Sequence, residues 1–195
     1  MLLMKRKRSL VSLVGAVVMG LVSQSTVMAG HADEDTKAVA GTVTCGGNYF
    51  TRKGGTELNT TNYILRNLAD SGAIDIDRIR VFNAHGVVLF DSDTSGMPVF
   101  QNNVLSAADT ALDPHQTAQL KVEEMIPLQG QLTRPLQAVF NWSAKKKILT
   151  LEASVVRVNL DRDPVSGQNG RQRGRHLYEC RTTSLKKHKR HERDD

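Results

Sequence analysis

The sequence predicts an all-β chain built from short antiparallel strands. Apolar and polar residues alternate over short runs, which is the period of a strand with one buried face. Glycine, proline, asparagine and aspartate gather between these runs, as expected of turns, and no run has a helical period. Two sheets packed face to face would bury the alternating faces. We therefore expect a single Ig-like or fibronectin-like sandwich of about seven or eight strands, with a small β-barrel as the alternative.

The strands are expected to follow one another through short connections. They are predicted at residues 38–44, 58–68, 74–82, 87–90, 117–123, 136–142, 148–160 and 176–182. Residues 83–86 (NAHG) form the turn of the clearest hairpin. Residues 91–109 and 161–175 are rich in polar residues and are expected to be loops.

The N-terminus has the three parts of a secretory signal peptide. Four basic residues at 5–8 precede an apolar stretch, and Val27 and Ala29 supply small residues for cleavage. We expect residues 1–29 to be a cleavable signal, with cleavage after Ala32 as a second choice and an uncleaved membrane anchor as the alternative. No later segment predicts a membrane span, so the mature chain is expected in the periplasm or the medium.

Charge is concentrated at the two ends of the chain. Of 26 basic and 20 acidic residues, four basic ones lie in the signal, and five basic and three acidic ones lie at 186–195. The 17 basic and 17 acidic residues of 30–185 then balance. A nucleic-acid-binding face would cluster lysine and arginine on the fold itself, so this distribution argues against one. We divide the mature chain into a first strand and turn-rich segment (30–56), the sandwich core (57–183) and a basic, disordered tail (184–195).

The chain has two cysteines: Cys45 directly follows the first predicted strand, and Cys180 lies in the last one. Disulfides persist in the oxidising compartments that exported proteins reach, so we expect these two to pair. Such a long loop would stabilise the fold by roughly 4–5 kcal/mol on the chain-entropy model. There is no Cys-x-x-Cys redox or haem-attachment motif, and no partner base is evident for a cysteine nucleophile.

Several stretches resemble a bacterial family of exported domains of unknown function. They are YILRN (63–67), VFNAHG (81–86), LDPHQTAQLKVEE (112–124), VFNWSA (139–144) and LEASVV (151–156). The order and spacing of strands are similar over about residues 57–183. The resemblance implies a β-sandwich and export, and it transfers no site. The loop at 91–111, the cysteine pair and the basic tail depart from the family pattern.

Two groups of residues are candidates for binding. Asp91 and Asp93, with Gly96, match the start of a calcium loop, although Ser95 and Asn102 are poor ligands at the later positions. The alternative is a polar loop at the end of a hairpin. His85 and His115, in predicted turns, are possible further ligands. Long sandwich loops often carry function, so residues 91–111 are also a candidate.

The second group is a basic patch of Arg171, Arg173 and Arg175. On a strand edge their alternation would place them on one face, where they would contact an anionic envelope surface or another envelope protein. The alternative is charged protection of the sheet edge against aggregation.

No catalytic motif is evident. The sequence has no nucleophile elbow, no phosphate loop and no close pair of carboxylates expected to face one cleft. We therefore predict an exported, non-enzymatic sandwich without a cofactor, with a binding or structural role in the cell envelope. The alternative is a periplasmic module that binds a metal or a small ligand.

Overall fold

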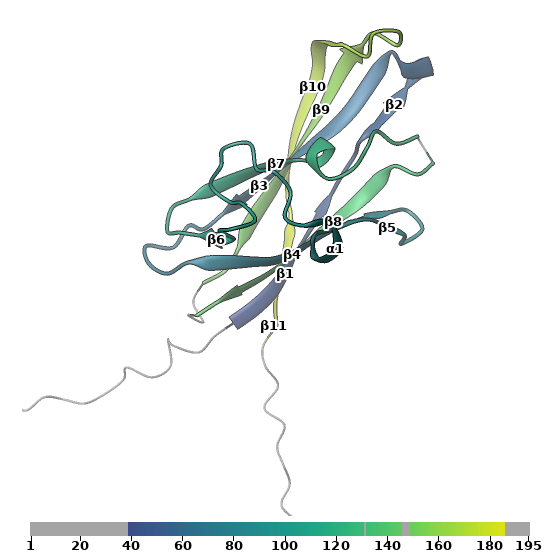
Figure 1. The fold of residues 1–195 in the computed structure, drawn as a ribbon. Coiled ribbons are helices and arrows are strands. Elements are labelled where there is room, and N and C mark those ends of the chain that lie inside the picture. The colour runs from purple at the N-terminus through teal and green to yellow at the C-terminus, as the bar shows by residue number, and fades with distance from the viewer. Residues whose placement is uncertain (1–38, 131, 146–148, 186–195) are drawn as a thin grey trace, which may run out of the picture. The chain divides into compact units, whose positions relative to one another are not determined.

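The computed structural model describes residues 39–130, 132–145 and 149–185, which form two antiparallel sheets packed against each other (Figure 1). The first, sheet A, has six strands in which β6 pairs with β4 beside the main path. In spatial order they are β11 (Arg181–Leu185), β1 (Val39–Gly46), β8 (Pro135–Ala144), β4 (Ile74–Asn83) and β5 (Val88–Asp91), with β6 (Ala111–Leu112).

Sheet B has five strands, and three short helical turns lie in the connections. The strands are β10 (Asn169–Glu179), β9 (Glu152–Arg162), β3 (Glu57–Arg66) and β2 (Phe50–Arg52), with β7 (Thr117–Lys121) also paired to β3. The turns are η1 (Lys53–Gly55), α1 (Ser92–Ser95) and η2 (Val122–Glu124). The predicted antiparallel sandwich is confirmed, and the barrel alternative is wrong because the sheets do not close.

The described chain has eleven strands rather than seven or eight. β2 and β6 are only three and two residues long, too short to show an alternation. The prediction of a loop over 161–175 is also wrong, because β9 runs to Arg162 and β10 begins at Asn169. All of β10 except Gly174 is exposed, so this edge strand has no buried face to leave an apolar pattern.

The predicted strand at 176–182 is divided between the two sheets at Cys180. β10 pairs with β9 in sheet B, and β11 pairs with β1 in sheet A. The Cys180 N–H still donates to the Ala153 carbonyl of β9 at 2.9 Å. One nearly continuous segment therefore forms an edge of both sheets.

The disulfide lies at this crossing, and the predicted pairing of Cys45 with Cys180 is confirmed. The two Cα atoms are 4.7 Å apart and the residues are 135 positions apart in sequence. Cys45 is on β1, next to β11, so the bond fastens the crossing segment to the first strand. A disulfide indicates an oxidising environment.

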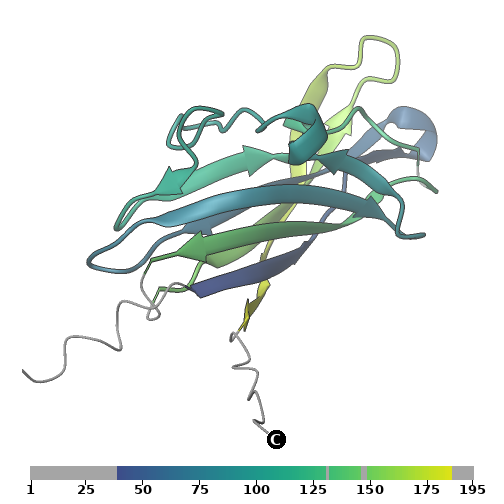
Figure 2. The same cartoon turned by 60° about the horizontal axis from the view of Figure 1, so that its bottom comes forward.

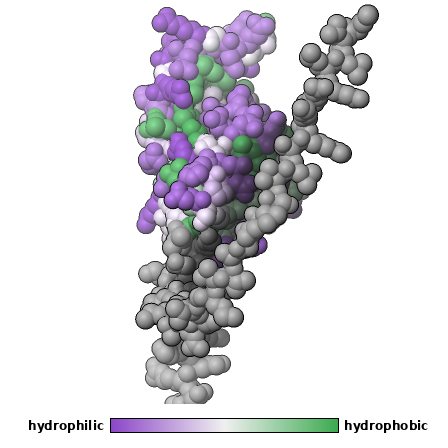
Figure 3. Space-filling model, turned by 90° about the vertical axis from the view of Figure 1, so that its left-hand side faces the viewer, coloured by the Kyte–Doolittle hydropathy of each residue, from purple (hydrophilic) through white to green (hydrophobic). Residues whose placement is uncertain are grey.

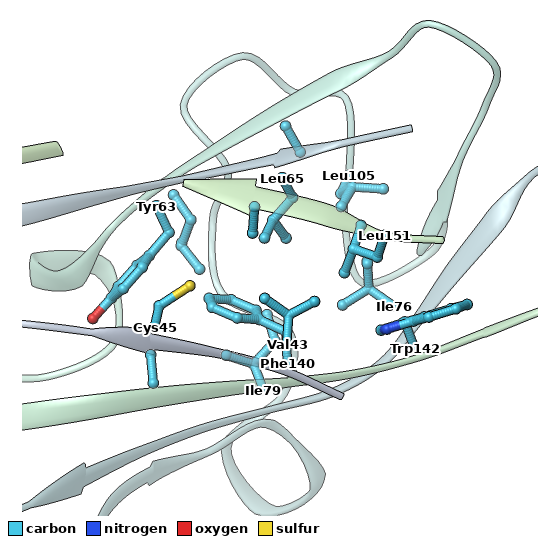
Figure 4. Close-up of a cluster of buried hydrophobic side chains, with 14 of the residues drawn as sticks. Val43, Cys45, Tyr63, Leu65, Ile76, Ile79, Leu105, Phe140, Trp142 and Leu151 are labelled. Atoms are coloured by element: carbon cyan, nitrogen blue, oxygen red, sulfur yellow. The ribbon is translucent and has the colours of Figure 1, made fainter. Parts of the chain in front are cut away.

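The core fills the space between the sheets (Figure 4). Alternate residues of each central strand face inward, for example Tyr63 and Leu65 of β3 and Phe140 and Trp142 of β8, all fully buried. The rings of Tyr63 and Phe140 meet edge to face with centroids 5.4 Å apart, which is a favourable aromatic geometry. Figure 4 shows Tyr63 beside Cys45, with its hydroxyl at the margin of the cluster.

The expected signal at 1–29 lies outside the described residues, and so does most of the predicted tail, from residue 186 onward. Strand β11 runs to Leu185, two residues beyond the predicted end of the core. In the part of the chain that the structure describes, no helix is both long and apolar enough to cross a bilayer.

Gly41 should be essential to packing, because it lies opposite Trp142 in the β1–β8 ladder. A Cβ at Gly41 would lie 2.6 Å from two atoms of the indole ring and 2.7 Å from the Thr183 carbonyl. We expect Gly41→Ala to lower the free energy of unfolding by roughly 1–3 kcal/mol, as overpacking does. Gly130→Ala is the matched control, since its Cβ would have Thr133 Oγ1 at 3.8 Å as its nearest neighbour. Equal urea midpoints for the two variants would contradict this packing.

Reduction of the disulfide should destabilise the folded chain by about 5 kcal/mol, the value the chain-entropy model gives for a loop this long. Urea unfolding with and without reductant measures the difference. The double variant Cys45→Ala/Cys180→Ala is the control and should not respond to reductant. Unchanged stability of the wild-type chain on full reduction would show that the bond does not support the fold.

Candidate functional site

The predicted calcium-binding carboxylates of Asp91 and Asp93 both contact Arg78 on the neighbouring strand β4. Arg78 Nη2 lies 2.5 Å from Asp91 Oδ2, and Arg78 Nε lies 2.9 Å from both Asp91 Oδ1 and Asp93 Oδ2. The Arg78 side chain is the main reason that the pKa of Asp91 is lowered. Asp91 also accepts a hydrogen bond from the Asp93 N–H and so caps α1.

Arg78 therefore already supplies the positive charge at this corner. In the described residues, no three histidine, cysteine, aspartate or glutamate side chains gather as a metal set, so neither His85 nor His115 joins these aspartates. His115 instead lies 3.4 Å from Asp70. Metal binding at Asp91 and Asp93 stays a prediction, and a cation there would have to compete with Arg78.

The predicted basic patch of Arg171, Arg173 and Arg175 lies on the exposed edge strand β10. The register against β9 shifts between Asn169 and Gln172 and again between Gln172 and Gly174. These bulges interrupt the simple alternation that would place all three arginines on one face. Arg173 is paired with Asp161 of β9. A contact role for the patch stays a prediction, and bulges and charges are also the means by which edge strands avoid aggregation.

A different site emerges from the inner face of sheet B. Along β3 and β9 the paired residues Leu65 with Ala153 and Tyr63 with Val155 are apolar and buried in the core. The next two pairs on the same face are polar: Thr61 with Arg157, and Asn59 with Asn159. The apolar face of a sandwich sheet thus continues as a polar face toward the β9–β10 hairpin, which projects from the rest of the fold (Figures 1 and 2).

This polar part of the sheet contains a hollow of about 200 Å³, which we call the Arg157 hollow. It is lined by Asn48, Asn59, Thr60, Arg157, Val158, Asn159, His176 and Tyr178. β3, β9 and β10 supply every lining residue except Asn48, which follows β1 and whose N–H donates to Thr61 Oγ1 at 2.8 Å. Hydrophilic residues predominate at this end of the sandwich in the side view of Figure 3.

Three buried polar atoms at the hollow have no hydrogen-bond partner within the described part of the chain. They are Asn59 Nδ2 and Arg157 Nε, which are donors, and Asn159 Oδ1, which is an acceptor. Thr60 Oγ1 is also buried without a partner, but strand alternation directs it to the opposite face. A buried polar group left without a partner costs about 1–3 kcal/mol, so native proteins have few of them.

Arg157 is held in place by its neighbours without a carboxylate. Its guanidinium lies over the Tyr178 ring, 5.0 Å from the centroid, which is a cation–π contact. On another side it approaches Gly46 so closely that a Cβ there would lie 2.4 Å from Arg157 Nη2. None of the ion pairs found among the described residues includes Arg157.

The carboxylates farther along the same face have their own cations. Glu57 lies 3.4 Å from Lys53 Nζ and accepts a hydrogen bond from Asn159 Nδ2 at 2.5 Å. The bond from Asn159 is the main reason that the pKa of Glu57 is lowered, so this carboxylate is ionised. Asp161, paired with Arg173, is the next inward-facing residue of β9. The hollow therefore has one uncompensated positive charge.

Tyr63 marks the boundary between this hollow and the core. Burial raises the pKa of its hydroxyl, and the nearby Arg157 charge opposes that rise. The hydroxyl has no hydrogen-bond partner among the residues that the structure describes, although Tyr63 is fully buried. Tyr63 is therefore neutral at every physiological pH and offers no charge to balance Arg157.

The lining offers groups that can bind a polar ligand. It offers a guanidinium, three amides, an imidazole, a phenol and a threonine, with no serine, cysteine or carboxylate among the lining residues. A nucleophile with an adjacent base, or a pair of carboxylates, is what hydrolytic chemistry requires. Hydrogen bonds and one positive charge instead suit a polar ligand.

This site was not predicted from the sequence. Its signal is the side-chain order on one face of two predicted strands: apolar Ala153 and Val155 are followed at the same period by polar Arg157 and Asn159. β3 shows the same change from Tyr63 to Asn59. A face that changes from apolar to polar within one strand indicates that the covering sheet ends there.

Comparison with known protein families, curated proteins and solved structures finds no match to this chain. The resemblance to an exported bacterial family stays a prediction. The function has to be inferred from the geometry of the molecule itself.

Replacing Arg78 with Gln should raise the pKa of Asp91 toward its ordinary value of 3.8. A carboxyl whose folded-state pKa is lowered adds stability above its unfolded pKa and loses it as the pH falls through the folded value. The difference in free energy of unfolding between wild type and Arg78→Gln should therefore be largest near neutral pH and should decrease below about pH 4. Urea unfolding at a series of pH values measures it.

Arg175→Gln is the control for this titration, because Arg175 is exposed and forms none of the ion pairs among the described residues. The difference in free energy of unfolding between wild type and Arg175→Gln should not change with pH. A difference for Arg78→Gln that stays constant down to about pH 2.5 would mean that the Asp91 ion pair does not contribute as described.

Proposed function

We propose that this protein is an exported, non-enzymatic Ig-like β-sandwich of the bacterial cell envelope that binds a small polar ligand in the Arg157 hollow. The signal-like N-terminus and the Cys45–Cys180 disulfide support an extracytoplasmic location. The lining of the hollow supports binding.

The observation that carries the proposal is the set of unpartnered atoms in one place. Asn59 Nδ2, Arg157 Nε and Asn159 Oδ1 come from two adjacent strands and lie on one face of the sheet. A ligand that forms hydrogen bonds with these groups would remove the free-energy cost of leaving them buried and unpaired. Polar groups positioned in advance by a rigid sheet also bind with little loss of conformational entropy.

The metal-binding alternative has less support. The carboxylates proposed for it are paired with Arg78, whereas the groups of the Arg157 hollow are unpaired. The hollow itself carries a positive charge, which repels a metal cation. A small organic ligand is therefore the better candidate.

A ligand-dependent rise in melting temperature tests this proposal, because a compound that binds only the folded state stabilises it. We expect at least one class of compound from a panel of neutral sugars, sugar acids, amino acids, other organic acids and inorganic anions to stabilise wild type. The variant Gly46→Ala should not respond, because the added Cβ displaces the Arg157 guanidinium.

Gly46→Ala is suited to this test because the atom that its Cβ meets is the end of a flexible side chain, so the fold should tolerate the change. Gly130→Ala is the control and should respond like wild type. A panel in which no compound distinguishes wild type from Gly46→Ala would overturn the proposal.

A further inference from the structure

Building on the proposed binding function, we propose that the ligand of the Arg157 hollow is a small hydroxylated carboxylate, of which a sugar acid is the simplest example. Its carboxylate pairs with the Arg157 guanidinium, and one of its hydroxyl groups donates to Asn159 Oδ1. Each part of this assignment rests on a separate feature of the hollow.

The negative charge follows from the charge balance. Arg157 is half-buried and has no carboxylate partner, while Glu57 and Asp161 on the same face are occupied by Lys53 and Arg173. A partly buried charge is expensive without a counter-charge. An anionic ligand supplies the counter-charge that the described residues do not.

A carboxylate fits better than a phosphate or sulfate dianion. The lining of the hollow contains one guanidinium, and Lys53 and Arg173 farther along this face are paired with Glu57 and Asp161, so a single negative charge is matched. A guanidinium presents two parallel N–H donors to the two oxygens of a planar carboxylate. The cation–π contact with the Tyr178 ring helps to position this fork.

The hydroxyl groups follow from the two asparagines. Asn159 Nδ2 donates to Glu57, which fixes the orientation of this amide and leaves its Oδ1 as a buried acceptor without a partner among the described residues. Only a ligand with a donor can satisfy that atom. Asn59 Nδ2, on the opposite strand, is a donor that requires an acceptor. A hydroxyl group can serve both, because it donates and accepts.

The size of the hollow limits the ligand to a small molecule. Its volume of about 200 Å³ is below the 300–1,000 Å³ that is usual for drug-sized ligands. The hollow therefore suits a ligand of about one six-carbon unit rather than an oligomer that is buried along its whole length. The exposed ring of Tyr178 leaves the hollow open on the β10 side, where a longer molecule could continue into solvent.

Isothermal titration calorimetry with three probes tests the assignment on the full mature chain with its disulfide intact. Sodium glucuronate carries both a carboxylate and hydroxyl groups, glucose carries only hydroxyl groups, and inorganic phosphate carries charge without a carbon skeleton. We expect saturable one-to-one binding of glucuronate. Glucose and phosphate should each bind at least about tenfold more weakly, because the loss of one charged hydrogen bond raises the dissociation constant by more than tenfold.

Two variants locate the binding. Arg157→Gln removes the charge, and Asn59→Asp replaces a donor with a carboxylate of the same shape that repels the ligand and competes for Arg157. Both should weaken glucuronate binding at least about tenfold. The control Arg175→Gln removes an exposed arginine of the same sheet and should bind like wild type. Circular dichroism and melting curves establish that each variant is folded before it is titrated.

The outcomes separate this inference from the proposed function. If glucose binds as tightly as glucuronate and Arg157→Gln has no effect, the carboxylate assignment is wrong although the hollow still binds a ligand. Phosphate binding that exceeds glucuronate binding would likewise overturn it in favour of an inorganic anion site. If no probe binds and no compound of the wider panel stabilises wild type over Gly46→Ala, both proposals fail.

Discussion

The crossing of one segment between the two sheets is the constraint on which the fold depends. β10 ends at Glu179 on the edge of sheet B, and β11 begins at Arg181 on the edge of sheet A. Cys180, between them, is bonded to Cys45 of β1 and also donates its N–H to β9. The last strands are thereby fastened to the first, and the spacing of the two sheets is set at one edge. On the chain-entropy model this cross-link across 135 residues contributes about 5 kcal/mol, which is a large part of the usual net stability of a domain.

The same crossing determines where the binding site forms. β1 ends at Gly46, close to the disulfide, whereas β3, β9 and β10 of sheet B continue beyond it. Their inner face is consequently no longer covered by apolar side chains, and it becomes polar at Thr61 and Arg157. Gly46 leaves room for the guanidinium, and Asn48 borders the hollow. The Cys45–Cys180 disulfide and the Arg157 hollow are thus neighbours because both lie where sheet A ends.

The sequence predicted those parts of the fold in which burial imposes a pattern. Residues such as Ile74, Ile76 and Phe140 alternate because one side of each strand meets the core, and the strands that contain them are present as expected. Residues 169–175 of β10 escaped prediction because the strand is exposed on both faces, so its arginines and Gln172 follow no burial pattern. The hollow escaped because Asn59, Arg157 and His176 are distant in sequence and meet only through strand register. Asp91 and Asp93 were selected on local spacing alone, and that spacing cannot reveal Arg78 as their partner on another strand.

The most direct test of the account is the NMR signal of the Arg157 Nε–H group, which the structure leaves buried and without a partner. Arg78 provides an internal reference in the same spectrum, because its Nε–H is already bonded to Asp91. The account predicts that sodium glucuronate shifts the Arg157 signal saturably and slows its exchange with water, while the Arg78 signal does not move. An Arg157 signal that stays unchanged up to high glucuronate concentration, or that moves in parallel with Arg78, would contradict the central claim that this guanidinium is held ready for an anionic ligand.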